Sequence, residues 1–174
     1  MGLSLLFVES DKYFRDAISS RLNRNEFRFF GANQIGAATA ILSQKPIDVG
    51  LVDLSSLKIE GVRIVEEIKR IKPHVEIITI NTYDYFNNSI AAMKAGVFDD
   101  FLVPVEINTL IRSIQAAGAH KIKLEKKRRP LLRKCQDAMM AVAFAEVGEL
   151  TTAQIIAETG GFSHKPEEKR DGQG

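Results

Sequence analysis

Three groups of polar side chains stand where apolar stretches of the sequence end. They are Glu9, Ser10 and Asp11 after the run 3–8, Asp53 within the run 49–54, and Asn81 and Thr82 after the run 75–80. Open α/β sheets gather their chemistry at the carboxyl ends of their strands, so a carboxylate such as Asp53 could take part in a reaction there. A carboxylate at a strand end can also simply cap a turn. The stretch around Asp53 leaves both roles open.

The elements that position these groups alternate regularly along the chain. Apolar runs of strand length are predicted at 3–8, 27–30, 49–54, 75–80 and 98–103. Each is followed by apolar residues at helical spacing, at 14–22, 37–42, 64–71, 90–95 and 107–114. This alternation predicts an α/β fold with a doubly wound parallel sheet and helices on both faces. The carboxyl ends of the strands then form one polar, acidic crevice.

Composition excludes several other classes of protein. Cys135 is the only cysteine, so no internal disulfide can form, and a cytoplasmic location is expected. The three histidines are scattered and give no zinc pattern. The start of the chain lacks the basic segment of a signal peptide, and no run is long enough to span a membrane. Neither a nucleotide-binding glycine loop nor a catalytic triad pattern is found, so an enzyme is not expected.

The chain resembles the receiver domain of bacterial response regulators over residues 1–119. The resemblance rests on VESD at 8–11, on LVDL at 51–54 with Gly61 eight residues after Asp53, on AAMKAGVFDDFL at 91–102, and on Pro104. It implies a CheY-like, five-stranded sheet in the order 2-1-3-4-5. It also implies that Asp53 is the phosphoacceptor and that Glu9, Ser10 and Asp53 occupy the positions that bind Mg²⁺.

The sequence departs from the receiver pattern at the positions that support phosphorylation. Ser10 replaces a metal-binding acid, Asn81 replaces the hydroxyl residue with Thr82 adjacent, and Val103 replaces the lysine before Pro104. The family's reporter aromatic falls at Asp100, and Leu57 replaces a loop proline. A neutral Ser10 predicts a weak or absent Mg²⁺ site. The Val103–Pro104 bond could be cis or trans.

These departures favour a pseudo-receiver: a two-component signalling protein that acts through protein contacts. The contact face is expected within residues 88–115, where Ala91, Ala92 and Ala95 either admit a partner closely or pack inward. Expected partners are a histidine kinase, a downstream signalling protein or, through this face or the C-terminal helix, a second copy. The alternative is a working phosphorelay receiver that takes phosphate from a histidine kinase onto Asp53.

A basic extension follows the alternating pattern. Residues 120–134 carry eight lysines and arginines against Glu125, a charge of +7, whereas the whole chain carries +2, which leaves −5 for the remainder. Such a stretch can attract nucleic acid or form a solvated helix face. A transcriptional regulator that uses this extension is therefore a further alternative, although without interleaved aromatic residues nucleic-acid binding is not favoured.

The last part of the chain is predicted to be helical and then disordered. Pro130 is expected to begin a new helix, on which Leu132, Cys135, Met139 and Val142 form an apolar stripe. Thr151 and Gln154 form a capping-box pattern for a short second helix, so residues 120–160 are predicted to form a helical hairpin. Residues 161–174 are expected to be a disordered polar tail. They supply no recognition helix for a helix-turn-helix.

Overall fold

A computed structural model describes residues 2–22 and 27–146, together with the single residues 154 and 158. Its five parallel strands are β1 (Leu3–Val8), β2 (Phe27–Ala32), β3 (Val49–Asp53), β4 (Glu76–Asn81) and β5 (Asp99–Leu102). Their order in the sheet is β2-β1-β3-β4-β5, which confirms the predicted topology. Asp53 on β3 is paired with Ile80 on β4, so the polar strand ends lie side by side as expected.

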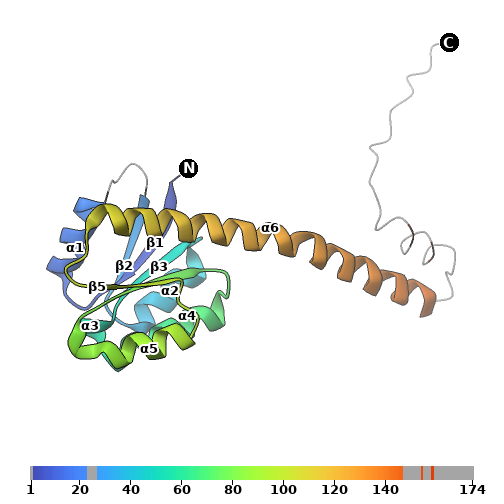
Figure 1. Ribbon diagram of the computed structural model, residues 1–174. Coiled ribbons are helices and arrows are strands. Elements are labelled where there is room, and N and C mark those ends of the chain that lie inside the picture. The colour runs from blue at the N-terminus through green and yellow to red at the C-terminus, as the bar shows by residue number, and fades with distance from the viewer. Residues whose placement is uncertain (1, 23–26, 147–153, 155–157, 159–174) are drawn as a thin grey trace, which may run out of the picture. The chain divides into compact units, whose positions relative to one another are not determined.

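The helices cover both faces of the sheet (Figure 1). They are α1 (Lys12–Arg21), α2 (Ile35–Gln44), α3 (Leu54–Leu57), α4 (Ile59–Ile71), the 3-10 turn η1 (Tyr83–Tyr85), α5 (Phe86–Lys94) and α6 (Ile107–Glu146). Successive side chains of a strand point to opposite faces, and the buried residues accordingly form two cores. One core lies beneath α2, α4 and α5, and the other beneath α1 and the first turns of α6.

One residue marks the start of α1 and another marks the end of α5. Asp11 is the N-cap of α1, since its Oδ1 accepts hydrogen bonds from the backbone N–H groups of Tyr13 at 2.7 Å and Phe14 at 3.2 Å. Gly96 follows the end of α5 with φ +89°, a left-handed conformation that glycine adopts without steric cost. The Val103–Pro104 peptide bond is cis.

The prediction that Pro130 begins a new helix is wrong, because α6 continues through it from Ile107 to Glu146. A proline removes one backbone donor from the helix ladder. Pro130 is exposed, so water can bind the carbonyl oxygen that loses its partner. The lysines, arginines and leucines around it are good helix formers. The predicted short helix from Thr151 and the predicted tail 161–174 lie largely outside the described residues.

The chain divides into two compact units, Met1–Glu125 and Lys126–Gly174. The first unit ends six residues after 119, the position at which the sequence placed the end of the receiver domain. Leu110, Ile114 and Ala117 are completely buried on α6. At Gly118 a Cβ atom would lie 2.7 Å from the Leu3 side chain, so a larger residue there would require the Leu3 side chain to move.

Candidate functional site

An open cleft of about 360 Å³ lies at the carboxyl ends of β1 and β3. It is lined by Glu9, Asp11, Phe14, Asp53, Ser55, Ser56 and Val103. Three of these residues are acidic, and among the residues that the structure describes no lysine or arginine lines the cleft. The predicted acidic crevice is therefore present, and the described residues that line it include no ammonium or guanidinium group.

Asp53 ends β3 and caps the short helix α3 that follows. Its Oδ1 accepts three hydrogen bonds: from Ser55 N at 2.7 Å, Ser55 Oγ at 2.5 Å and Ser56 N at 3.1 Å. The residue is only 3% exposed. One carboxylate oxygen is thus committed to holding the loop after β3. Both roles considered for Asp53 from the sequence meet here, since a turn-capping carboxylate also lines the cleft.

Glu9 is the second buried acid of the cleft, with 1% of its surface exposed. Its Oε1 accepts hydrogen bonds from Asp11 N at 2.7 Å and Ser10 Oγ at 3.4 Å, whereas Oε2 has no hydrogen-bond partner among the described residues. Burial, together with the neighbouring Asp53 carboxyl group, raises the pKa of Glu9 to about 7. Near neutral pH about half of the Glu9 side chains are therefore uncharged.

The acidic residues do not form the donor set of a tight Mg²⁺ site. No group of three or more acidic, histidine or cysteine side chains within the described ranges is placed to hold a metal ion. Asp11 uses its Oδ1 as a helix cap, and Ser10 offers a neutral hydroxyl. Hard cations prefer several anionic oxygens, and here one of the two remaining acids, Glu9, is half protonated near neutrality.

Asn81 lies at the position expected to contact a phosphoryl group, but its side chain is used elsewhere. Its Nδ2 donates to Tyr85 O and to Ser89 Oγ, both at 2.8 Å, and its Oδ1 accepts from Thr82 N at 2.9 Å. Asn81 is fully buried, and neither Asn81 nor Thr82 belongs to the lining of the cleft. These bonds tie the end of β4 to η1 and α5.

Val103 does line the cleft, at the position where the receiver pattern has lysine. Ser55 and Ser56 line it as well, although the sequence reasoning did not single them out. The sequence could have indicated them, because two hydroxyl residues follow Asp53 within three positions. On β5, Asp100 accepts a hydrogen bond from the fully buried Thr79, so the position of the family's reporter aromatic holds a fixed acidic side chain.

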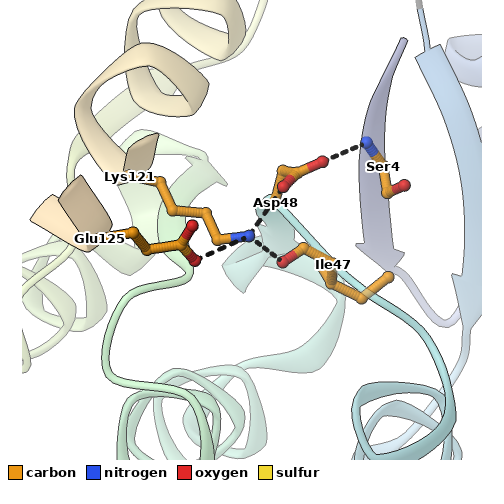
Figure 2. A network of polar contacts seen from close by, with 5 residues as sticks. All are labelled: Ser4, Ile47, Asp48, Lys121 and Glu125. Atoms are coloured by element: carbon orange, nitrogen blue, oxygen red, sulfur yellow. Dashed lines mark hydrogen bonds and ion pairs between the residues drawn. The ribbon is translucent and has the colours of Figure 1, made fainter. Parts of the chain in front are cut away.

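The opposite edge of the sheet carries a network of basic and acidic residues (Figure 2). Lys121 on α6 donates to Asp48 Oδ1 at 2.7 Å and Ile47 O at 3.0 Å, and its Nζ lies 3.5 Å from Glu125 Oε1. Asp48 also accepts a hydrogen bond from Ser4 N at 2.8 Å. These contacts, which we call the Lys121 clasp, hold α6 against the residues that precede β3.

A second buried acid lies beside the Lys121 clasp. Glu76, the first residue of β4, pairs with Lys69 Nζ at 3.3 Å and contacts His120 Nδ1 at 2.9 Å. The ring of His120 also lies 5.7 Å from that of Phe98. Neighbouring residues of α6 therefore bind the start of β4, through Glu76, and the residues that precede β3.

The expected contact face presents large apolar side chains rather than alanines. Ala92 is fully buried, and Ala91 and Ala95 pack against the core, so these alanines point inward. The exposed large apolar side chains of η1 and α5 are Tyr83 (77%), Phe86 (55%), Ile90 (41%) and Met93 (59%). Phe86, Ile90 and Met93 recur at spacings of four and three and form one stripe along α5.

The basic extension lies on α6. Lys123, Lys126, Lys127, Arg128, Arg133 and Lys134 are exposed on this helix. In the described part of the chain, no helix has the length and apolar content needed to cross a membrane.

Comparison with known proteins connects this geometry to one family. A family model described as "Response regulator receiver domain" matches residues 5–115. The photosynthetic apparatus regulatory protein RegA of Rhodovulum sulfidophilum is 26% identical over 115 residues, which cover 66% of this chain and 63% of RegA. The response regulator protein PilR of Pseudomonas aeruginosa is 26% identical over 112 residues, 64% of this chain and 25% of PilR.

A solved structure agrees with these sequence matches. A response regulator receiver domain protein from Clostridium thermocellum has a TM-score of 0.65 and 27% identity, covering 70% of this chain and 98% of that chain. The family match at residues 5–115 includes four complete strands, most of β1, and the residues that line the cleft.

Proposed function

The chain belongs to the family of response regulator receiver domains of two-component signalling, and we propose that it is a pseudo-receiver that signals through protein contacts. One observation carries the proposal: the acidic cleft at Asp53 contains no cationic side chain among its described lining residues. A phosphoryl group arriving at Asp53 would bring further negative charge beside Glu9. A cation normally offsets that crowding.

The supporting side chains also favour this proposal. Val103 cannot make the charge-assisted hydrogen bond of a lysine, a contact worth about 1.5–3 kcal/mol. Asn81 is held by Tyr85 and Ser89, away from the cleft. Receiver domains generally bind Mg²⁺ at this site, but the donor set here is poor, so we propose a weakened or absent Mg²⁺ site and derive no step through the ion.

The output of such a pseudo-receiver is proposed to be its apolar contact face. The stripe Phe86, Ile90 and Met93 is exposed on α5, whereas exposed large side chains on a receiver core without a contact function would be scattered. A histidine kinase or a downstream signalling protein is the kind of partner we propose, in the cytoplasm, without an enzymatic activity of the chain's own.

The alternative is a working phosphoacceptor, and one observation favours it. Asp53 lies in an open cleft at the carboxyl end of β3, where a phosphodonor could reach it. A direct test is intact mass after incubation with acetyl phosphate and Mg²⁺. Three variants accompany the wild-type chain: Asp53→Asn, Val103→Lys, and Val103→Lys combined with Ser10→Asp.

We expect no phosphate-sized gain in the wild-type chain and a gain in the double variant, which restores an ammonium and a metal-binding acid to the cleft. Labelling of the wild-type chain that is lost in Asp53→Asn would refute the pseudo-receiver and establish the phosphorelay alternative. The transcriptional alternative has its own test. A salt-dependent mobility shift with random duplex DNA at low salt would support it, and no shift would remove it.

A further inference from the structure

The two buried acids of the cleft each keep one carboxylate oxygen outside the hydrogen bonds that hold the loops. In Asp53 the three bonds from the loop after β3 all end on Oδ1. In Glu9 the bonds from the next two residues end on Oε1, and Oε2 has no partner among the described residues. Both acids line the same cleft. Asp53 Oδ2 and Glu9 Oε2 are therefore the acceptors that a ligand of this cleft can use.

These acceptors require a positively charged donor. Both residues are almost completely buried, with Glu9 1% and Asp53 3% exposed. A buried acceptor without a hydrogen bond carries the full cost of its desolvation, and this cost is larger for a charged group. Among the described residues that line the cleft, no lysine or arginine supplies the donor. A ligand with N–H donors and a positive charge therefore complements the cleft better than a neutral or an anionic one.

The arrangement of the acceptors favours an ammonium group over a guanidinium group or a metal ion. A guanidinium group forms its strongest pairs with a carboxylate that offers both oxygens side by side. Here each carboxylate offers one oxygen, because the other holds a loop. The three donors of an ammonium group point apart and can reach two separate oxygens. A hard divalent cation prefers more oxygen ligands than these two acids provide.

The apolar part of the lining fits the stem of a lysine side chain. Phe14 and Val103 line the cleft together with the two acids. Both are half-buried and pack on the core beneath α1 and α6. Lysine buries its methylene stem along such a surface while its charged end reaches a polar partner. The cleft is open and has a volume of about 360 Å³, so the side chain of a folded partner can enter it.

We propose that the cleft at Asp53 receives the ammonium group of a lysine side chain from a partner protein. The ammonium group donates to Asp53 Oδ2 and Glu9 Oε2, and the stem lies against Val103. This inference rests on the proposed function, in which the chain signals through protein contacts. It names the chemistry of one such contact and places that contact in the cleft, apart from the stripe along α5.

A small probe, Nα-acetyl-lysine methylamide, carries the ammonium group and its stem without a partner protein. We expect this probe to shift the backbone amide NMR signals of residues 9–11, 55–56 and 103 of the full chain, with a dissociation constant of about 1–10 mM. The norleucine analogue has the stem without the charge, and the arginine analogue has a guanidinium group. Each should bind at least about 10-fold more weakly than the lysine probe. Equal binding by either analogue would overturn the proposal.

Two variants locate the probe in the cleft. Asp53→Asn keeps the shape of the side chain and removes its charge, so it should weaken binding at least about 10-fold. Val103→Lys should weaken binding by a similar factor, because it brings the chain's own ammonium group to the same oxygens. The matched control is Asp84→Asn, at an exposed acid of η1 that does not line the cleft, which should change binding less than about 2-fold. Dispersed NMR spectra verify that each variant is folded, and wild-type affinity in Asp53→Asn or Val103→Lys would overturn the proposal.

The titration separates this inference from the proposed function, because the probe and acetyl phosphate are different ligands. A chain that acetyl phosphate labels on Asp53 and that also binds the lysine probe would refute the pseudo-receiver and support the ammonium site. A chain that acetyl phosphate does not label, and whose signals the probe leaves unchanged up to about 50 mM, would overturn the ammonium site and leave the pseudo-receiver in place.

Discussion

Replacing Lys121 by methionine tests whether the Lys121 clasp holds α6 on the sheet. The side chain is 12% exposed, and its Nζ lies 2.7 Å from Asp48 Oδ1 and 3.0 Å from Ile47 O. Methionine keeps most of the apolar stem and removes the charge and both hydrogen bonds. A hydrogen bond to a charged group contributes about 1.5–3 kcal/mol. Asp48 is 26% exposed and can regain water, which places the expected loss near the lower end.

We therefore expect Lys121→Met to lower the free energy of unfolding by about 2 kcal/mol. In a unit of this size that corresponds to a melting temperature lower by about 8 °C. Urea unfolding followed by circular dichroism measures the change. Lys123→Met is the matched control: it removes the same charge from an exposed position two residues away and should stay within about 0.5 kcal/mol of the wild type. Equal effects of the two variants would refute the clasp.

Two further predictions concern Glu9 and the glycines. Because the folded chain raises the pKa of Glu9 from 4.5 to about 7, it binds more protons than the unfolded chain between these pH values, and stability falls as pH rises through this window. Glu9→Gln should thus stabilise the fold at pH 8 by about 1–2 kcal/mol, less than the full pKa shift implies because water in the open cleft screens the charge. In urea titrations this gain in stability should vanish by pH 4.5. A gain that is the same at both pH values would contradict the raised pKa of Glu9. Gly96→Ala should cost about 1–2 kcal/mol because φ is +89° there, whereas Gly36→Ala on α2, where a Cβ meets nothing within 4 Å, should stabilise by about 0.5–1 kcal/mol. If the melting temperatures of the two variants shift in the same direction, the backbone conformation at these glycines does not determine the effect of alanine on stability.

The sheet could be predicted from the sequence because its determinants are local. Each strand overlaps a predicted apolar run, and the side chains of β3 and β4 are buried throughout, as a strand covered on both faces requires. The ends of elements were less certain. The last strand was expected over 98–103 and forms over Asp99–Leu102, one residue shorter at each end.

The site could be predicted only in part, since position along the chain does not fix the direction of a side chain. Glu9, Asp53 and Val103 line the cleft as their strand ends imply. Asn81 does not, because Tyr85 and Ser89, which lie on elements later in the chain, provide its hydrogen-bond partners. The ion pair between Lys121 and Asp48 joins residues 73 positions apart, and periodicity in the sequence does not predict such a pair.

The short strand β3 bears an aspartate at each of its two ends. Asp48 precedes the strand and holds α6 through Lys121, while Asp53 closes it and lines the cleft. Five residues of extended chain separate them by about 16 Å. A change at the end of β3 that lines the cleft is therefore separated along the chain from the contacts that attach α6 at the other end.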